Sequence, residues 1–381
     1  MIPYGRQSLD ASDAEAVLAT LHSDWLTQGP AIPAFEAEMA AYCQARHAVA
    51  VCNATAALHL ACLALDVGPG DRVWTSPNTF VASANCARYC GAEVDFVDID
   101  PSSLNMDTAA LADKLAAAAR QNRLPKVIIP VHFAGQPCDM AAIGALAKQY
   151  GCRVIEDASH AIGASYQGGR TGNGAHSDIT VFSFHPVKII TTGEGGMALT
   201  NNTALAARMA RLRSHGITRE AAEMQDEPEG PWYYQQIDLG FNYRLTDLQA
   251  ALGSSQLRRL DTFLARRRAL VERYDQLLAD LPLTCPRCTA DRESAWHLYP
   301  IRVAAERRRE IFERLRGDGI GVQVHYIPVH LQPDYRRLGF QPGDFPAAEA
   351  YYREAISLPL YADLEFAQQD TVVAALARAL I

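Results

Sequence analysis

The chain has 381 residues, of which 49% are hydrophobic, and its formal net charge at pH 7 is −8. This length is enough for two domains with a large core, and the composition is that of an ordinary globular protein. Acidic and basic residues are interspersed, so no basic stripe indicates binding to nucleic acid and no polybasic segment indicates binding to an anionic membrane.

The sequence also lacks targeting signals and a metal motif. No apolar stretch approaches the roughly 18 residues of a membrane span, and the first residues lack a signal peptide's hydrophobic region, so we expect a cytoplasmic protein. Most of the nine cysteines lie inside apolar patterns, where a thiol behaves as a small hydrophobic group. Cys285 and Cys288 have the spacing of half a zinc or redox site, but no matching Cys/His pair follows, so we expect no metal.

Short apolar strands alternate with helical segments between about residues 46 and 200. The expected strands are residues 47–52, 72–76, 93–99, 126–133, 153–156, 178–184 and 197–200, and the expected helices include 55–65, 81–90 and 140–150. Strands rich in Val and Ile that alternate with helices are typical of a mostly parallel sheet covered on both faces. This half of the chain is therefore predicted to be an α/β domain.

Long helices and a smaller mixed unit are expected after residue 245. Helices are predicted over 245–260, 260–278 and 308–316, and strands over 297–303 and 321–325. We place the domain boundary near residue 250, which gives a large domain over residues 1–250 and a smaller α+β domain over 251–381.

Polar side chains follow several predicted strands at the point where each strand ends. They are Asn53, Thr55, Thr79, Asp157, Ser183 and Lys188. Ligands of such sheets bind outside the carboxyl ends of the strands, so these groups should converge on one edge. A lysine in a partly desolvated pocket loses proton affinity and becomes available for Schiff-base chemistry. A solvated lysine at a strand exit is the alternative interpretation of Lys188.

The turn into the helix after Asn53 has small residues, so its free backbone amides and the Thr55 hydroxyl could hold an anion. An ordinary N-cap by Asn53 or Thr55 is the alternative. The chain has neither a G-x-G-x-x-G motif after a strand nor a G-x-x-x-x-G-K-[ST] motif. Enzymes of the dinucleotide-binding and P-loop classes are therefore disfavoured.

Two further residues suggest a flat, cationic ring as the ligand. Asp157 ends a buried strand, where a carboxylate needs a cation such as a protonated pyridine nitrogen, although it could instead cap its own loop. Phe80 could face such a ring, although it could also be a core aromatic residue. Together these features match the needs of pyridoxal 5'-phosphate (PLP): a helix start that can bind an anion, an aromatic ring face, a carboxylate, a hydroxyl and a lysine.

The chain resembles the sugar aminotransferases of the DegT/DnrJ/EryC1/StrS family, which have PLP fold type I, the aspartate-aminotransferase fold. The motifs that carry the resemblance are Ile2-Pro3-Tyr4-Gly5-Arg6, Trp25-Leu26-Thr27-Gln28-Gly29-Pro30, Pro77-Asn78-Thr79-Phe80, Glu156-Asp157-Ala158-Ser159-His160, Ser183-Phe184-His185-Pro186-Val187-Lys188, Gly240-Phe241-Asn242-Tyr243-Arg244-Leu245-Thr246-Asp247 and His325-Tyr326-Ile327-Pro328-Val329-His330. Residues 77–85, 130–139 and 185–196 are most similar to a subgroup of the pseudaminic acid pathway. That subgroup aminates C4 of a UDP-linked 4-keto-6-deoxy-N-acetylhexosamine.

The resemblance implies a set of cofactor contacts. Lys188 would be the catalytic residue that forms a Schiff base with PLP, and Asp157 would pair with the pyridine nitrogen. Phe80 would stack on the ring, Ala54, Thr55 and Ser183 would contact the phosphate, and His160 stands where many relatives carry Gln. Asn242 matches a residue that reaches the phosphate of the neighbouring subunit, which implies a homodimer.

The resemblance also implies sugar contacts and a reaction. The residues in regions that contact the nucleotide sugar are Tyr4, Asp24, Trp25, Leu26, Thr27, His325, Tyr326, Ile327 and Pro328, and Arg6, Arg244 and His330 are candidates for its diphosphate. A dehydratase branch of the family has histidine in place of the lysine, so Lys188 predicts transamination from L-glutamate. Another nucleotide-linked ketosugar, a PLP-dependent dehydratase or lyase, and a binding protein without activity remain open as alternatives.

Overall fold

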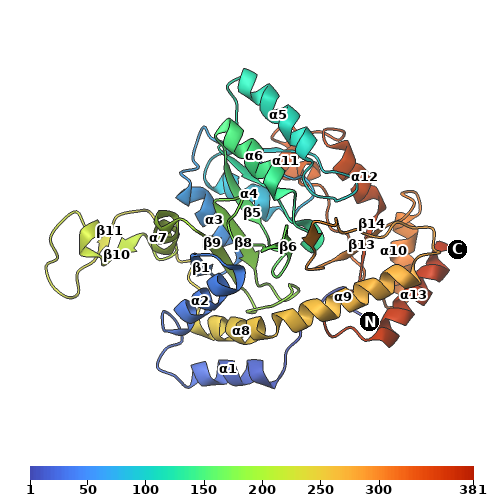
Figure 1. The fold of residues 1–381 in the computed structure, drawn as a ribbon, viewed down its shortest axis with the longest axis horizontal. Helices are drawn as coiled ribbons and strands as arrows, with labels where there is room; N and C mark the ends of the chain where they lie inside the picture. Colours follow the sequence, from blue (N-terminus) through green and yellow to red (C-terminus); the bar gives the residue numbers. More distant parts are fainter.

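The computed structural model describes residues 1–381 and is built around a seven-stranded sheet with strand order β1-β9-β8-β5-β4-β2-β3 (Figure 1). The strands are β1 (His47–Val51), β2 (Arg72–Thr75), β3 (Glu93–Phe96), β4 (Val127–Ile129), β5 (Arg153–Asp157), β8 (Ile179–Ser183) and β9 (Gly196–Thr200). Neighbouring strands from β3 to β8 are parallel, and β9 runs antiparallel to both β8 and β1. The predicted mostly parallel α/β sheet is confirmed.

Helices cover both faces of this sheet. The helices that pack around the sheet are α2 (Ala31–Cys43), α3 (Ala54–Ala64), α4 (Ala82–Tyr89), α5 (Thr108–Arg120), α6 (Met140–Tyr150) and α7 (Thr203–Leu212), whereas α1 (Ala11–Leu21) packs against α8 (Asp247–Arg258). Successive strand residues point to opposite faces: Val73 joins the core beneath α3, α4 and α7, whereas Trp74 joins the core beneath α5 and α6. Because both faces are buried at the centre of the sheet, β4 reads as a continuous apolar run, whereas the edge strand β3 alternates polar and buried apolar residues.

The C-terminal part forms a second core. Its elements are α8 (Asp247–Arg258), α9 (Leu260–Leu277), β13 (Tyr299–Arg302), α10 (Arg308–Gly317), α11 (Pro333–Arg336), α12 (Pro346–Glu354), β14 (Ala355–Leu358) and α13 (Phe366–Leu380). A separate hydrophobic cluster joins α9, α10, α13 and the antiparallel β13–β14 pair. All the buried residues of this cluster lie between Leu270 and Leu380, and on that ground we propose that residues 251–381 are the second domain. Helices α8, α11 and α12 pack instead into the hydrophobic clusters of the large sheet.

The strand expected over residues 321–325 is absent. Val322 is buried in the second core, which explains the apolar signal. The backbone bonds to different partners, however: Gly321 N–H donates to Ile2 O, while Gln323 forms an isolated bridge with Ser357. The partner of β13 is β14, which the sequence pattern did not predict.

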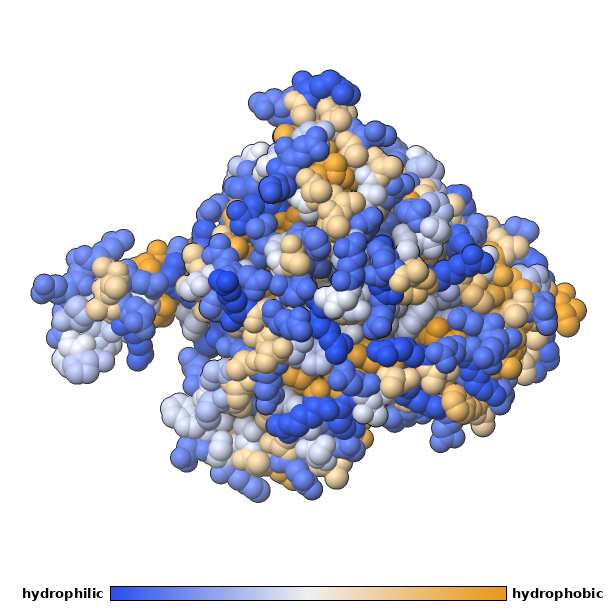
Figure 2. All heavy atoms as spheres, viewed as in Figure 1, coloured by the Kyte–Doolittle hydropathy of each residue, from blue (hydrophilic) through white to orange (hydrophobic).

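Several short strands and turns lie outside the seven-stranded sheet. A three-stranded sheet holds β6 (Ser165–Tyr166), β7 (Gly169–Arg170) and β12 (Arg292–Glu293), and 3-10 turns cover Phe133–Gly135, Ala221–Glu223 and Val329–Leu331. The hairpin of β10 (Ile217–Thr218) and β11 (Gln235–Gln236) lies on an arm that projects from the body (Figure 1). Figure 2 shows hydrophobic side chains on this arm, where Trp232 and Leu239 are 71% and 84% exposed.

None of the helices combines the length and apolar character needed to cross a membrane.

Candidate functional site

A cavity of about 490 Å³ lies at the carboxyl edge of the parallel strands. Asp157 ends β5, Ser183 ends β8, and Asn53 stands between β1 and α3, so separate strand exits supply its walls. The loop after β8 adds Lys188. This convergence follows from the strand order, because strands that run in the same direction present their carboxyl ends at one edge.

Lys188 is half-buried in this cavity. Burial lowers the pKa of its amine from 10.5 to about 8, and the charge of Asp157 only partly opposes the shift. A substantial fraction of the amine is therefore neutral just above neutral pH and able to attack a carbonyl. The alternative of an ordinary solvated lysine does not fit this environment.

Asp157 is buried, and its carboxylate accepts two hydrogen bonds from the protein. Ser83 Oγ donates to Oδ2 at 2.6 Å, and the Ser159 N–H donates to Oδ1 at 3.1 Å. A carboxylate has about four acceptor positions, so two remain for a ligand.

The start of α3 is capped by Asn53 and also leaves backbone amides free for an anion. Asn53 is the N-cap, since its side chain accepts a hydrogen bond from Ala56 N–H at 2.8 Å. Helix geometry leaves the N–H groups of Ala54 and Thr55 without partners inside the helix, which keeps them available to an anion. Gly196 packs against this turn so closely that a Cβ atom there would lie 2.5 Å from Ala54 N. The turn is thus a tight cradle, and Ser183 pairs directly with Gly196 in the sheet.

Phe80 lies in the cavity wall and is 59% exposed, so the core-aromatic interpretation is wrong for this residue. Its ring centroid lies 6.3 Å from that of Tyr326, which lines the same cavity. An exposed aromatic face in a cavity suits a flat ligand ring better than it suits solvent.

Three histidines surround the inner end of the cavity. The His160 ring lies 4.4 Å from the His297 ring, centroid to centroid, and His160 Nε2 is 3.1 Å from Tyr326 Oη. Burial, together with the charge of Lys188, lowers the pKa of His325 to about 3 and holds the pKa of His160 well below its usual range. The pKa of His297 is lowered in the same way, by burial and by His160. The three imidazoles are therefore neutral at pH 7.

The structure gathers part of the predicted set around the cavity. The predicted residues that line it are Tyr4, Ala54, Thr55, Phe80, Asp157, His160, Ser183, Lys188, His325 and Tyr326. Residues in its wall that the sequence did not single out as site residues include Leu58, Ala82, Val131, Ser159, His185, Val187 and Glu194. Ser159 and His185 lie inside the family motifs, so the sequence did contain a signal that they belong to the site. His297, which packs behind His160, lies in no motif.

The remaining predicted residues lie outside the cavity wall; apart from His330, they are Arg6, Asp24, Trp25, Leu26, Thr27, Asn242, Arg244, Ile327 and Pro328. Trp25 and Leu26 expose 54% and 47% of their surface. The expectation that His330 contacts a diphosphate is wrong, because His330 is fully buried and its Nε2 lies 3.0 Å from Glu349 Oε1.

The profile of the DegT/DnrJ/EryC1/StrS aminotransferase family matches residues 7–377 of the chain. The chain belongs to this family. The Bacillus subtilis (strain 168) spore coat polysaccharide biosynthesis protein SpsC is 41% identical over 98% of this chain and 96% of that protein. The putative sugar aminotransferase Spr1654 from Streptococcus pneumoniae, in its PMP form, has a TM-score of 0.91 at 32% identity and covers 100% of this chain and 99% of that one.

A third relative is Helicobacter pylori PseC, an aminotransferase involved in the biosynthesis of pseudoaminic acid. Its structure gives a TM-score of 0.91 at 31% identity and covers 100% of this chain and 99% of that one. The protein is therefore a PLP-dependent sugar aminotransferase with the aspartate-aminotransferase fold, as the sequence predicted.

The cavity of this family member fits PLP chemically. Lys188 supplies the amine, Asp157 retains acceptor positions for a ring N–H, and the start of α3 supplies amide donors beside the Ser183 hydroxyl. The buried Nδ1 atom of His160 has no hydrogen-bond partner within the protein, which leaves one polar group at this end of the cavity unsatisfied.

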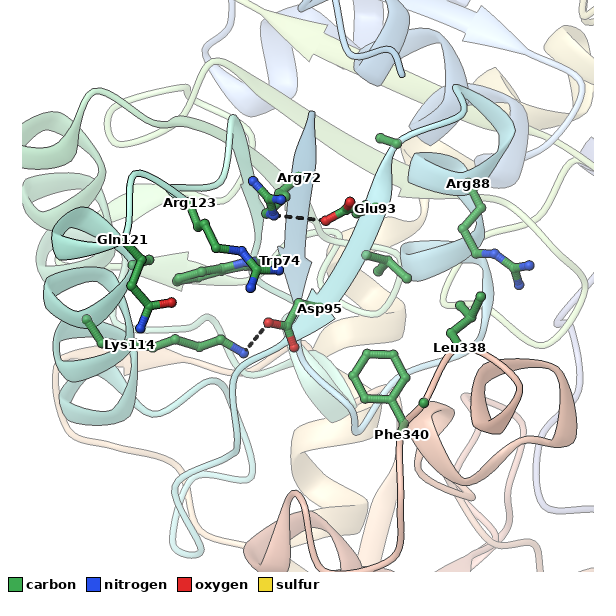
Figure 3. Close-up of a pocket in the computed structure, with 15 residues that line it drawn as sticks. Arg72, Trp74, Arg88, Glu93, Asp95, Lys114, Gln121, Arg123, Leu338 and Phe340 are labelled. Carbon is green, nitrogen blue, oxygen red and sulfur yellow. Dashed lines mark ion pairs between the residues drawn. The ribbon is translucent and has the colours of Figure 1, made fainter. Parts of the chain in front are cut away.

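A larger cavity, of about 720 Å³, lies elsewhere in the molecule, between β3, α5 and the loop before α12 (Figure 3). Four of its charged side chains form two ion pairs: Lys114 Nζ lies 2.8 Å from Asp95, and Arg72 Nε lies 2.9 Å from Glu93. It contains none of the predicted site residues. Size alone would thus have selected the wrong cavity.

Proposed function

We propose that this aminotransferase transfers the amino group of L-glutamate to C4 of a UDP-linked 4-keto-6-deoxy-N-acetylhexosamine. The product would be UDP-4-amino-4,6-dideoxy-N-acetyl-β-L-altrosamine, in pseudaminic acid biosynthesis. The observation that carries the transfer is Lys188, a half-buried amine with a pKa of about 8 facing Asp157 in a cavity suited to PLP. The choice of sugar is supported by the similarity to PseC over the whole chain.

Bound PLP would act as an electron sink for the carbon that loses a proton. The residues of the chain supply the rest of the chemistry. Asp157 would hold the ring nitrogen, and the start of α3 would hold the phosphate. Lys188 Nζ would move the proton from Cα of glutamate to C4′ of the cofactor, and in the second half of the cycle it would move a proton from C4′ to C4 of the sugar, with a pKa suited to both transfers near pH 8.

We propose that Tyr4, His325 and Tyr326 contact the sugar, because they line the cavity beside Lys188. Asp24, Trp25, Leu26, Thr27, Ile327 and Pro328 are proposed to contact the nucleotide part of the substrate outside that wall. The apolar exposure of Trp25 and Leu26 supports a surface that is covered in the working enzyme.

We propose that the working enzyme is a homodimer in which Asn242 reaches the neighbouring active site. Asn242 lies outside the cavity of its own chain, and the adjacent arm exposes Trp232 and Leu239. Mixed dimers of Lys188→Ala and Asn242→Ala chains test this arrangement. One site of each hybrid then combines an intact Lys188 with an intact Asn242 from the other chain, so activity should reappear on mixing. No recovery would mean that Asn242 acts within its own chain.

A different nucleotide-linked ketosugar is the second candidate substrate. The 41% identity to a protein named for spore coat polysaccharide biosynthesis favours it, because that name points to another surface sugar. The dehydratase branch is disfavoured by Lys188 itself, whereas a lyase would be distinguished by the absence of 2-oxoglutarate release.

The deciding experiment supplies the purified protein with glutamate and UDP-4-keto-6-deoxy-N-acetylhexosamine, and in parallel with dTDP-linked and GDP-linked ketosugars. We expect 2-oxoglutarate release and a sugar product that gains an amine by mass spectrometry, with NMR giving the configuration at C4. Preference for another nucleotide sugar would replace the proposed substrate. Conversion of the sugar without 2-oxoglutarate would contradict transamination.

A further inference from the structure

A chain of hydrogen bonds runs from α4 to the carboxylate of Asp157. Thr79 Oγ1 and Ser83 Oγ lie 2.8 Å apart, and Ser83 Oγ lies 2.6 Å from Asp157 Oδ2. Thr79 and Ser83 are 2% and 1% exposed, so water does not compete for these bonds. Ser83 is not part of the cavity wall; its hydroxyl contacts Asp157 and Thr79, which line the cavity, and lies 3.4 Å from the carbonyl oxygen of Phe80.

The chemistry of the acceptor sets the direction of this chain. An ionised carboxylate can only accept, so Ser83 must donate its single hydroxyl proton to Asp157. Ser83 Oγ must then accept from Thr79, whose hydroxyl becomes the donor. Hydrogen bonds that point the same way polarise one another, and a donor to a charged group is among the stronger kinds. The chain therefore directs a hydroxyl proton at Oδ2 of Asp157.

The same chain also fixes the orientation of the carboxylate. Ser83 belongs to α4, whereas Ser159 N–H, which donates to the other oxygen, belongs to the loop after β5. Each oxygen of the carboxylate thus accepts a hydrogen bond from a different element, and the two bonds together fix the orientation of the carboxylate plane. Thr79 immediately precedes Phe80 in the cavity wall. The same turn therefore positions both the Phe80 ring and the first hydroxyl of the hydrogen-bond chain.

We propose that Ser83 is a positioning residue for the cofactor: with Thr79, it holds the carboxylate of Asp157 in the orientation in which the ring nitrogen of PLP stays protonated. The proposal rests on PLP binding and is independent of the sugar that the enzyme uses. Ser83 itself contacts neither cofactor nor substrate.

The test compares Ser83→Ala and Ser83→Thr, each loaded with PLP labelled with ¹⁵N in the ring. The ¹⁵N NMR shift of the ring nitrogen is followed against pH, and single-turnover rates are measured with glutamate alone. We expect Ser83→Ala to move the ¹⁵N signal toward the unprotonated nitrogen and to slow the half-reaction about tenfold, with little change in the glutamate concentration for half-maximal rate. Ser83→Thr should restore both.

Ser254→Ala is the matched control, since Ser254 is also a buried helical serine and its side chain makes no hydrogen bond to the protein. The proposal is overturned if Ser83→Ala gives the ¹⁵N shift and rate of the control. If Ser83→Ala does not fold, Thr79→Val decides the question by the same NMR measurement. A displaced signal then supports the chain, and an unchanged one overturns it.

Discussion

The ring of His297 packs against the ring of His160, with centroids 4.4 Å apart. His160 follows β5 of the central sheet, whereas His297 precedes β13 of the C-terminal part. The His297 N–H donates to Ala134 O at 2.8 Å, and this bond fixes the second segment on the first. The inner end of the cavity is therefore built by both parts of the chain.

Replacing His297 with Ala should weaken PLP binding about tenfold. The substitution removes an aromatic pair worth about 0.5–1.5 kcal/mol and leaves a void behind His160. Absorption titration of the apoprotein with PLP measures the change. His297→Phe keeps a packed ring and should bind PLP nearly as well as the native protein; equal weakening by Phe and Ala would contradict the packing argument.

The rate at which the apoprotein captures PLP should rise as the pH increases through about 8. The pKa of Lys188 is lowered to about 8, so its amine is protonated below that value and nucleophilic above it. Stopped-flow absorption between pH 6 and 10 gives the midpoint. A midpoint near 10.5, the ordinary value for lysine, would show that the amine is solvated. Lys188→Ala should show no such capture at any pH.

His160→Gln should leave that midpoint unchanged. The pKa of His160 is held well below its usual range, mainly by burial, so the imidazole stays neutral and carries no charge that titrates between pH 6 and 9. Glutamine is neutral and can hydrogen-bond as well. The same stopped-flow series on the variant provides the comparison, and a displaced midpoint would show that His160 carries charge in this range.

Gly196→Ala should weaken PLP binding by about tenfold or more, which is about 1.4 kcal/mol or more. The added Cβ would lie 2.5 Å from Ala54 N and must displace the turn whose amides we propose to hold the phosphate. Gly68→Ala is the control, because nothing lies within 4 Å of its added Cβ. Unchanged PLP affinity in the Gly196 variant would place the phosphate elsewhere.

Arg267→Leu should lower the free energy of unfolding by about 2–5 kcal/mol. The buried guanidinium donates to the carbonyl oxygens of Trp296, His297 and Leu360 at 3.0–3.3 Å. Burial lowers its pKa to about 10, so it remains charged at pH 7. Arg268→Leu, at an exposed position one residue along α9, should change stability by less than about 0.5 kcal/mol. Denaturant unfolding of both variants checks the difference, and similar losses would contradict a role for the buried bonds.

The sequence alone determined the α/β sheet and the edge at which the cavity lies. Strands and the residues that follow them are local in sequence, so periodicity placed Asp157, Ser183 and Lys188 at strand ends, and parallel strands bring those ends together. The family motifs then related these positions to PLP chemistry. Strand patterns and motifs both consist of residues that are close together in the sequence.

Only the tertiary structure decided which distant residues support the site. It packed His297 behind His160, joined Ser83 to Asp157 and buried His330 against Glu349. It also assigned the partner of β13 to β14 rather than to residues 321–325. These contacts join segments far apart in the chain, and the packing of whole elements selects them, so no local pattern of residue types encodes them.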